Sequence, residues 1–348
     1  MKIVVLAAGT STERAVSIVS GTGICRALRA NGHQAILVDI FSGWKEADPE
    51  TAFDDAYDID EAVRYINSFN DHLEEEIASR REFFGPNVLD LCRRADIVFL
   101  ALHGANGEDG KVQAAFDLLG IRYTGTDYLS SAISMDKSRT KQVFHEEGIS
   151  TPRGITVFRG EKRRSSAEFG LDLPLIVKPC CGGSSVGVSI CHTDEELAKG
   201  LDIAFSLEES ALIEEFIEGD ELTCAVIDRE AYPIVLICPK TGYYDYTNKY
   251  QAGCTDEFCP APIPEEKTKE IQALAIKAND ALGILGYARF DFLMRRSDKK
   301  IYCLECNTLP GMTPTSLVPL EASVVGMDYI SLCEKLIEVS MKKYRKEA

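Results

Sequence analysis

Long apolar runs are missing from this sequence. None of them approaches the roughly 18 consecutive apolar residues that a membrane-spanning helix requires. A secretory signal is missing too, because the apolar stretch at residues 1–9 is short and soon ends at a glycine. We interpret that stretch as a buried first strand. The two absences predict a cytoplasmic protein with no membrane partner.

Basic residues are scarce relative to acidic ones. Lysine and arginine number 38 against 55 aspartates and glutamates, which gives a formal net charge of −17. Proteins that bind nucleic acid need positive charge along the phosphate backbone, so we expect no nucleic-acid partner. A single nucleotide is not excluded by this argument, because its phosphates need only a local positive site.

The 12 cysteines are irregularly spaced and lie mostly in apolar segments. In the absence of a secretion signal we interpret them as reduced thiols. The closest groupings are Cys180 with Cys181, Cys254 with Cys259, and Cys303 with Cys306. On the strand predicted for the last pair the two thiols would face opposite ways, and no second matching pair supports a zinc site.

The first part of the chain alternates predicted strands and helices. Apolar segments at 3–7, 35–40 and 95–102 predict parallel strands, and helical spacing covers 15–30. Polar helices are predicted at 60–69 and 73–84. This α/β pattern is typical of a doubly wound parallel sheet.

The pattern changes after residue 124. One helix is predicted over 132–147, ended by Gly148. Further strands are predicted at 155–158, 173–178, 211–217, 221–228 and 233–238. Residues 265–282 have the spacing of an amphipathic helix, and a closing helix covers 329–344.

Two common nucleotide-binding motifs are absent: Gly-x-Gly-x-x-Gly and Gly-Lys-Ser/Thr do not occur. A different loop is present. Lys178 ends a predicted strand, and glycines and serines follow it through Gly187. Backbone N–H groups of such a loop can surround phosphate oxygens, while Lys178 adds a cation. The alternative is a flexible surface loop.

A hairpin near the C-terminus carries the strongest pattern. Arg289, Asp291 and Leu293 share one parity, as do Ile301, Cys303, Glu305 and Asn307, with a polar turn between them. With the turn centred on Asp298, Asp291 would pair with Glu305 and Arg289 with Asn307. Opposed like charges destabilise a sheet, so a cation is expected there, and oxygen ligands favour Mg²⁺. The alternative is a solvated sheet face of mixed charge.

Two loops follow predicted strands of the N-terminal sheet, at the edge where open parallel sheets bind ligands. Glu13 lies in the first loop beside a helix start, and could hold an ammonium group or cap the helix. His103 lies in the second, glycine-rich loop, and could act as a base, donate a hydrogen bond or be structural.

Three other segments carry candidate ligand-binding groups. Lys137 lies on a predicted helix, where an exposed surface position is the alternative. The strand and turn over 212–219 could present backbone groups to an adenine, with Glu214 or Glu221 accepting ribose hydroxyls, or could be a plain hairpin. Residues 241–253, polar and aromatic, predict a long loop that is either a lid or ordinary surface.

Together and in this order, these segments resemble the D-alanine–D-alanine ligases of the ATP-grasp superfamily. The resemblance covers residues 2–336 and weakens over 44–94. The motifs that carry it are Thr10-Ser-Thr-Glu-Arg14, His103-Gly with 107–110, Ser134-Met-Asp-Lys137, Lys178-Pro with 183–187, Tyr244-Asp-Tyr with Lys249-Tyr250, Arg289-Phe-Asp291, and 305–313 with Ser316-Leu317.

The resemblance implies an ATP-grasp fold of α/β and α+β type with three domains. These are a doubly wound substrate-binding domain at 1–125, a central domain at 126–213 and a catalytic domain at 214–348, with ATP between two mainly antiparallel sheets. It also implies a homodimer. The first D-alanine's carboxylate would attack the γ-phosphate, and the amine of the second would attack the resulting acyl phosphate.

Site residues follow from the same resemblance. The residues implied for ATP are Lys137, Lys178, Ser185, Glu214, Ile217, Glu221 and Lys249, and those for two Mg²⁺ ions, or Mn²⁺, are Asp291, Glu305 and Asn307. Catalytic residues are Glu13, Ser184, Tyr250, Arg289 and Gly311, and the second substrate's pocket has His103, Ser316 and Leu317. Arg289 and the Gly311 N–H would stabilise an oxyanion.

Other functions remain as alternatives. Sibling ligases that use D-serine or D-lactate are nearest, although Tyr250 favours dipeptide formation. A nicotinamide-dependent oxidoreductase would need the missing glycine motif. A catalytically silent ATP-binding regulator would not need the Arg289, Asp291, Glu305 and Asn307 set. Departures from the family pattern are Cys180-Cys181-Gly182, Ala15 and Glu215.

Overall fold

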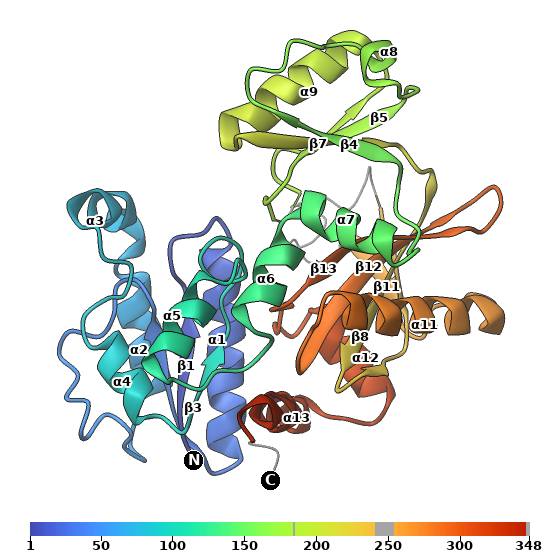
Figure 1. Cartoon of the computed structure of the whole chain (residues 1–348). Helices are drawn as coiled ribbons and strands as arrows, with labels where there is room; N and C mark the ends of the chain where they lie inside the picture. The colour runs from blue at the N-terminus through green and yellow to red at the C-terminus, as the bar shows by residue number, and fades with distance from the viewer. Residues whose placement is uncertain (184, 241–253, 346–348) are drawn as a thin grey trace.

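The computed structural model describes residues 1–183, 185–240 and 254–345 of the chain. Within these ranges the strands form a parallel sheet of three strands and antiparallel sheets of four and six strands. Figure 1 shows the parallel sheet in the N-terminal body, the four-stranded sheet in an upper lobe, and the six-stranded sheet in the C-terminal body. This arrangement agrees with the predicted fold class.

The parallel sheet buries both of its faces. Its strands are β1 (Lys2–Ala7), β2 (Gln34–Asp39) and β3 (Ile97–Leu100), in the spatial order β2-β1-β3. One face packs against α1 (Arg14–Ala30) and α13 (Tyr329–Met341). The other packs against α4 (Val88–Arg94) and α5 (Lys111–Leu119), two helices outside the predicted set. This double cover explains the uninterrupted apolar runs of the strands.

Between β2 and β3 the chain is mostly helical and polar, as predicted. The elements here are α2 (Ile59–Asn67), η1 (Asn70–His72) and α3 (Leu73–Ser79). The predicted extension of the last helix to residue 84 is wrong, because the backbone turns extended at Arg80.

The upper lobe is a sheet covered on one side. Its elements are β4 (Gly154–Phe158), α8 (Ser166–Phe169), β5 (Leu175–Pro179), β6 (Ser189–Cys191), α9 (Asp194–Leu207) and β7 (Ser210–Glu215), with strand order β4-β7-β5-β6. Apolar side chains of β5 and β7 pack against α9 and α8. The opposite face carries Ile176, Lys178 and Glu214, and is therefore available to form a site.

The six-stranded sheet has the order β11-β10-β8-β12-β13, with β9 beside β8. Its elements are β8 (Gly219–Ile227), β9 (Glu230–Ala231), β10 (Val235–Pro239), β11 (Thr255–Phe258), α11 (Glu265–Ala281), β12 (Tyr287–Arg295), β13 (Ile301–Asn307) and α12 (Leu317–Val324). α11 packs on one face, and α12 contacts β8. The predicted domain limits of 1–125, 126–213 and 214–348 stay a prediction.

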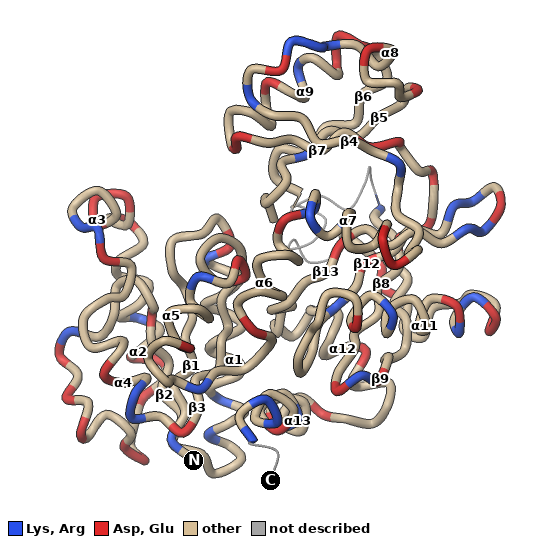
Figure 2. The backbone as a smooth tube through the Cα atoms, in the orientation of Figure 1, with Lys and Arg blue, Asp and Glu red and all other residues tan. Residues whose placement is uncertain are grey.

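Three short helices complete the described chain: α6 (Tyr128–Met135) and α7 (Lys137–Glu146) link the bodies, and η2 (Lys342–Tyr344) follows α13. None of the described helices combines the length and apolar character that crossing a membrane requires. Figure 2 shows acidic and basic residues interspersed along the described chain.

The single helix predicted over 132–147 is wrong. α6 and α7 are separate, because the backbone at Asp136 is extended, with φ −85° and ψ 99°. The Asp136 side chain accepts hydrogen bonds from the backbone N–H groups of Ser138 (2.9 Å) and Arg139 (3.1 Å), and so caps α7. Lys137 therefore begins a helix instead of lying within one.

A β-bulge in β13 corrects two predictions about side-chain direction. Leu304 is the extra residue in the ladder between β12 and β13. Leu304 and Glu305 both face the cavity described below, whereas Ile301, Cys303 and Cys306 lie in the hydrophobic core. The predicted shared face of Cys303 and Glu305 is wrong, and so is the opposite placement of the two thiols, because a bulge reverses the alternation beyond it.

Candidate active site

A cavity of about 590 Å³ lies between the four-stranded and six-stranded sheets. Its volume is within the roughly 300–1,000 Å³ typical of small-molecule sites. The predicted ATP-binding residues that line it are Lys137, Lys178, Ser185, Glu214, Ile217 and Glu221. The structure thus brings together every predicted ATP-binding residue that it describes. We refer to this space as the inter-sheet cavity.

A second cavity of about 480 Å³ lies where the N-terminal and C-terminal bodies meet. The predicted residues that line it are Glu13, His103, Arg289, Glu305, Asn307, Gly311, Ser316 and Leu317. They come from the N-cap position of α1, the loop after β3, the β12–β13 hairpin, and the loop before α12 with the first residue of that helix. We refer to this space as the inter-body cavity.

The two cavities adjoin at a shared wall made of Lys137, Gly182 and Glu305. The Lys137 ammonium donates to the carbonyl oxygen of Gly182 at 2.6 Å and lies 3.5 Å from a carboxylate oxygen of Glu305. The exposed-surface alternative for Lys137 is therefore wrong. A group that passes from one cavity to the other meets both signs of charge at this wall.

Glu214 is buried and committed to two lysines. Its carboxylate forms ion pairs with Lys178 and with Lys141, a residue outside the predicted set. Burial is the largest influence on the pKa of Lys178 and of Glu214 and disfavours both charged forms. The attraction between the opposite charges nevertheless outweighs burial, so the pKa of Lys178 is raised and the pKa of Glu214 is lowered. Burial of Glu214 rules out the alternative of an exposed acid.

The β12–β13 hairpin has the predicted pairing at its polar end: Arg289 with Asn307 and Asp291 with Glu305. Arg289 donates two hydrogen bonds of 2.8 Å to Asp291 through Nε and Nη2. Thr223 Oγ1 (2.7 Å) and Asn307 Nδ2 (3.0 Å) also donate to this carboxylate. The positive charge of Arg289 thereby balances the negative charge of Asp291 in the structure. Lys137 does the same for Glu305.

The predicted metal ligands fit magnesium in their chemistry. Asp291, Glu305 and Asn307 offer oxygen atoms, which Mg²⁺ prefers, and Glu305 lines both cavities. Each carboxylate oxygen of Asp291 already accepts two hydrogen bonds. A cation at Asp291 would therefore replace one of these donors. Within the described residues no group of three His, Cys, Asp or Glu side chains could hold a metal ion, and the predicted set contains only two such residues, Asp291 and Glu305.

Glu13 lies at the N-cap position of α1, but its side chain caps no N–H group of that helix. The predicted helix-cap alternative is therefore wrong. Its Oε2 atom lies so close to two glycines that a Cβ would come within 2.8 Å at Gly183 and 3.0 Å at Gly104. Glycine at these positions lets the Glu13 carboxylate approach both the glycine-rich loop that follows β5 and the loop that carries His103.

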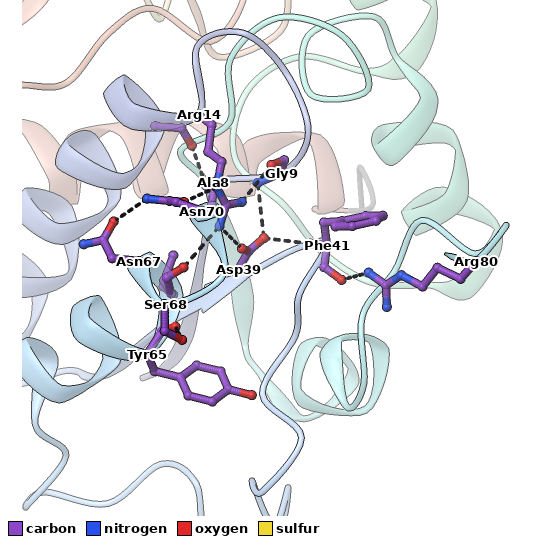
Figure 3. Close-up of polar contacts among 12 residues, drawn as sticks. Ala8, Gly9, Arg14, Asp39, Phe41, Tyr65, Asn67, Ser68, Asn70 and Arg80 are labelled. Atoms are coloured by element: carbon purple, nitrogen blue, oxygen red, sulfur yellow. Dashed lines mark hydrogen bonds and ion pairs between the residues drawn. The ribbon is translucent and has the colours of Figure 1, made fainter. Parts of the chain in front are cut away.

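A buried ion pair fixes the loop that ends at Glu13. Figure 3 shows Arg14, at the start of α1, directed toward Asp39 at the end of β2, with 2.7 Å between their charged atoms. Arg14 also donates to the carbonyl oxygens of Gly9 (2.7 Å) and Ile66 (3.2 Å) and to Asn70 (2.8 Å). Ile66 and Asn70 belong to residues 44–94, where the family resemblance is weakest. This region therefore helps to hold the loop that carries Glu13.

His103 is held in one tautomer by its neighbours. Its Nδ1 lies 3.0 Å from the carbonyl oxygen of Leu309, which can only accept, so Nδ1 carries the proton. Nε2 then accepts from Ser20 Oγ at 3.4 Å. Burial is the main cause that lowers the pKa of His103, so the ring is neutral at neutral pH. The ring lines the inter-body cavity while it also ties the β3 loop to Leu309.

The loop before α12 folds tightly around its own hydroxyls. A Cβ on Gly311 would lie 2.8 Å from Ser316 Oγ, so glycine permits the close approach. Ser316 Oγ in turn accepts from the Thr313 N–H at 2.9 Å. Leu317 begins α12 and contributes its side chain to the cavity wall.

Three predicted residues lie outside the described part of the chain: Ser184, Lys249 and Tyr250. The predicted loop at 241–253 lies outside it as well. Their roles stay predictions. Ser185, next to the first of them, has a φ of 59°, which places the loop backbone in the left-handed region there.

Comparison with known proteins identifies the family. The model for the D-ala D-ala ligase N-terminus matches residues 2–126, and the model for the D-ala D-ala ligase C-terminus matches residues 129–338. The chain belongs to the D-alanine–D-alanine ligase family. It is 41% identical to the D-alanine–D-alanine ligase of Lacticaseibacillus casei (strain BL23), covering 99% of this chain and 97% of that protein.

Other members of the D-alanine–D-alanine ligase family are similar over comparable lengths. The ligase of Pediococcus pentosaceus is 40% identical, covering 99% of each chain. Among solved structures, the ATP complex of the Bacillus anthracis ligase has a TM-score of 0.77 and 29% identity, with full coverage of both chains. The Coxiella burnetii ligase has a TM-score of 0.78 and 26% identity, covering 99% of this chain and 94% of that one.

In this member of the D-alanine–D-alanine ligase family, Glu108 also lines the inter-body cavity, although the sequence predicted no role for it. Its carboxyl accepts from the N–H groups of Gly104 (2.7 Å) and Leu309 (3.3 Å). Burial, followed by the charge of Glu13, raises its pKa to about 8. The sequence signal for Glu108 is the Gly107-Glu-Asp-Gly110 motif, because the carboxylate lies inside a glycine-rich loop after a buried strand.

Glu321 is a buried acid on α12, where its side chain contacts β8. One carboxyl oxygen accepts from the Ala225 N–H at 2.6 Å, and the other has no hydrogen-bond partner. Burial raises its pKa to about 8, so the folded protein holds this group protonated at neutral pH. The stabilisation that this bound proton gives the folded protein is fully present below about pH 4.3, the pKa of a glutamate in the unfolded chain. It is lost as the pH rises through about 8, the pKa of Glu321 in the folded protein.

We therefore expect Glu321→Gln, which cannot ionise, to gain stability relative to the parent as pH rises from 5 to 8.5. The gain should be on the order of 3 kcal/mol in the free energy of unfolding. Urea denaturation across this pH range measures it, with the exposed Glu338→Gln as the control. A difference between variant and parent that does not change with pH would contradict the assignment.

Proposed function

We propose that the protein joins two molecules of D-alanine into D-alanyl-D-alanine, with conversion of ATP to ADP, for peptidoglycan precursor synthesis. The observation that carries the proposal is the shared wall of Lys137, Gly182 and Glu305 between two cavities. One cavity has the lysines and glycine loop suited to a nucleotide's phosphates. The other has a carboxylate and an arginine suited to amino-acid substrates. The terminal phosphate and an amino-acid carboxylate would meet at the wall.

In the inter-sheet cavity the chain supplies positive charge and a backbone cradle. Lys178 and Lys137 would neutralise phosphate oxygens, as phosphoryl transfer requires. Ser185 and the adjoining loop would add N–H and hydroxyl donors. The adenine would lie beside Ile217, in the connection between β7 and β8, with Glu221 accepting hydrogen bonds from the ribose hydroxyls. Two magnesium ions held by Asp291, Glu305 and Asn307 would neutralise the transferred phosphoryl group.

In the inter-body cavity the chain orients two amino acids. Glu13 would bind the first D-alanine's ammonium group, linked through Ser184 to Tyr250. The first carboxylate attacks the γ-phosphorus and ADP leaves. The second D-alanine, placed by Ser316, Leu317 and His103, loses a proton from its ammonium group to water. Its amine then attacks the acyl carbon and phosphate leaves.

Arg289 and the backbone N–H of Gly311 are the proposed donors to the oxyanion that develops on the carbonyl oxygen when the amine attacks the acyl carbon. Both line the inter-body cavity, and Arg289 is also fixed by two hydrogen bonds to Asp291. A guanidinium held in this way needs little reorganisation when charge develops beside it. Positioning and charge neutralisation therefore account for most of the proposed catalysis.

One assay tests the proposed function. ADP release is measured with ATP and magnesium in the presence of D-alanine, D-serine, D-lactate and their mixtures with D-alanine. We expect D-alanine alone to support turnover, with D-alanyl-D-alanine identified by mass. Turnover that requires D-serine or D-lactate would indicate a sibling ligase, and nucleotide binding without ADP release would indicate a silent regulator.

The proposal also includes a homodimer that works in the cytoplasm. Membership of the family supports both points by analogy alone. Sedimentation equilibrium of the purified protein measures the first of them, and a single monomeric species at micromolar concentration would overturn it.

A further inference from the structure

Lys141 is a buried lysine for which the proposed reaction has no role. It lies on α7 four residues after Lys137, so both side chains leave the same face of the helix. Its side chain is 11% exposed. The ammonium contacts a carboxylate oxygen of Glu214, the Oγ1 of Thr151 at 3.0 Å and the carbonyl oxygen of Pro152. Lysine has three N–H donors, so these three acceptors use all of them and fix the group in place.

Glu214 lies between a lysine that faces the inter-sheet cavity and one that does not. Lys178 lines the cavity and contacts one oxygen of the Glu214 carboxylate. Lys141 is not part of the cavity wall and contacts the other oxygen. Among the described residues these are the two that form ion pairs with Glu214. The three side chains together carry one net positive charge.

That net charge matters when a phosphate binds. Lys178 can turn toward a phosphate oxygen only if Glu214 keeps another counter-ion, because an unpaired buried carboxylate is strongly unfavourable. Lys141 is that counter-ion. Burial lowers the pKa of Lys141, while the Glu214 carboxylate acts in the opposite direction. Without Lys141, the pair of Lys178 and Glu214 would be neutral and would attract phosphate weakly.

We propose that Lys141 is a positioning residue that holds Glu214 compensated, so that Lys178 is available to the phosphates of the nucleotide. The inference deepens the proposed function and rests on it, since it takes Lys178 as a phosphate-binding group. Lys141 acts through Glu214 and touches no substrate. Its removal should therefore weaken phosphate recognition and leave recognition of the nucleoside unchanged.

The experiment compares ATP with adenosine, which lacks phosphates, by calorimetry on the full-length protein. We expect Lys141→Met to weaken ATP binding roughly tenfold or more and leave adenosine binding within about twofold. KM for ATP should rise in parallel, while KM for D-alanine at saturating ATP stays unchanged. Lys141→Arg, which keeps the charge, should recover most of the affinity for ATP.

A double variant separates the proposed route from a direct contact. In Lys141→Met/Glu214→Gln the buried carboxylate is gone, so Lys178 is free of its counter-charge and the ATP-to-adenosine affinity ratio should recover. A ratio as low as in Lys141→Met alone would overturn the proposal. So would an equal loss of affinity for ATP and adenosine, because a purely structural role weakens both.

Two controls keep the outcomes distinct. Lys199→Met removes a lysine from an exposed pair with Glu195 on α9, and should leave the affinity ratio unchanged. The parent protein decides the proposed function separately, through ADP release with D-alanine. Release by the parent together with an unchanged ratio in Lys141→Met would overturn the inference alone.

Discussion

Glu305→Gln should lower kcat by roughly 10³-fold, because a lost metal ligand costs several kcal/mol of transition-state stabilisation and each 1.36 kcal/mol is tenfold in rate. Glu305 belongs to the wall that both cavities share and lies 3.5 Å from the Lys137 ammonium. The amide keeps the size of the side chain but removes its charge. ADP release at saturating ATP and D-alanine measures the effect.

A magnesium titration of the same variant gives a second readout. If Glu305 binds the cation, half-maximal activity should require a higher magnesium concentration than in the parent. Glu265→Gln, an exposed acid on α11 paired with Lys269, serves as the control and should behave as the parent does. Full turnover in Glu305→Gln at ordinary magnesium concentration would remove the metal role assigned to this residue.

Arg289→Met should lower kcat by about 10²–10³-fold, the loss measured when one oxyanion donor is removed from other enzymes. The side chain lines the inter-body cavity and is 14% exposed. Its effect should fall on kcat and on kcat/KM for D-alanine together, because the interaction forms as negative charge develops on the carbonyl oxygen of the acyl group. Steady-state kinetics at saturating ATP measure both constants.

Arg295→Met is a closely matched control for this change. Arg295 lies on the same strand and makes the same two-pronged contact with an aspartate, Asp298, but at the exposed end of the hairpin. Its loss should leave kcat within about twofold. Equal kinetics for Arg289→Met and Arg295→Met would refute the oxyanion role.

Much of the site could be predicted because local signals and motif order agree with each other. The parallel strands follow from apolar runs, and the pairing of Asp291 with Glu305 follows from a polar turn at the right distance. Every predicted site residue that the structure describes lines one of the two cavities. Each of these predictions needs only a short stretch of chain, or the family resemblance that links the stretches.

The errors arise where a single residue changes the local geometry. Asp136 ends one helix and caps the next, although the apolar spacing continues through it. Leu304 is one extra residue in a strand, and it turns Cys303 away from the face of Glu305. The periodic pattern of apolar residues shows neither the helix break at Asp136 nor the bulge at Leu304. Packing against the rest of the molecule stabilises both irregularities, and a periodic pattern does not record that packing.

Lys141 was missed for a different reason. Its partner Glu214 is 73 positions further along the chain, and the contact exists only once α7 lies beside β7. A lysine on a helix is usually exposed, so its type alone gives no signal. The available hint is its spacing of four residues from Lys137, which places both on one helix face.

The wall formed by Lys137, Gly182 and Glu305 has a consequence for inhibition. A compound long enough to occupy both cavities would contact these three residues at its middle. Substitutions that expel such a compound at that point would also damage phosphoryl transfer in the proposed reaction. Resistance to a bridging inhibitor should therefore arise at the outer ends of the two pockets, and molecules anchored at their junction should be the hardest for a bacterium to escape.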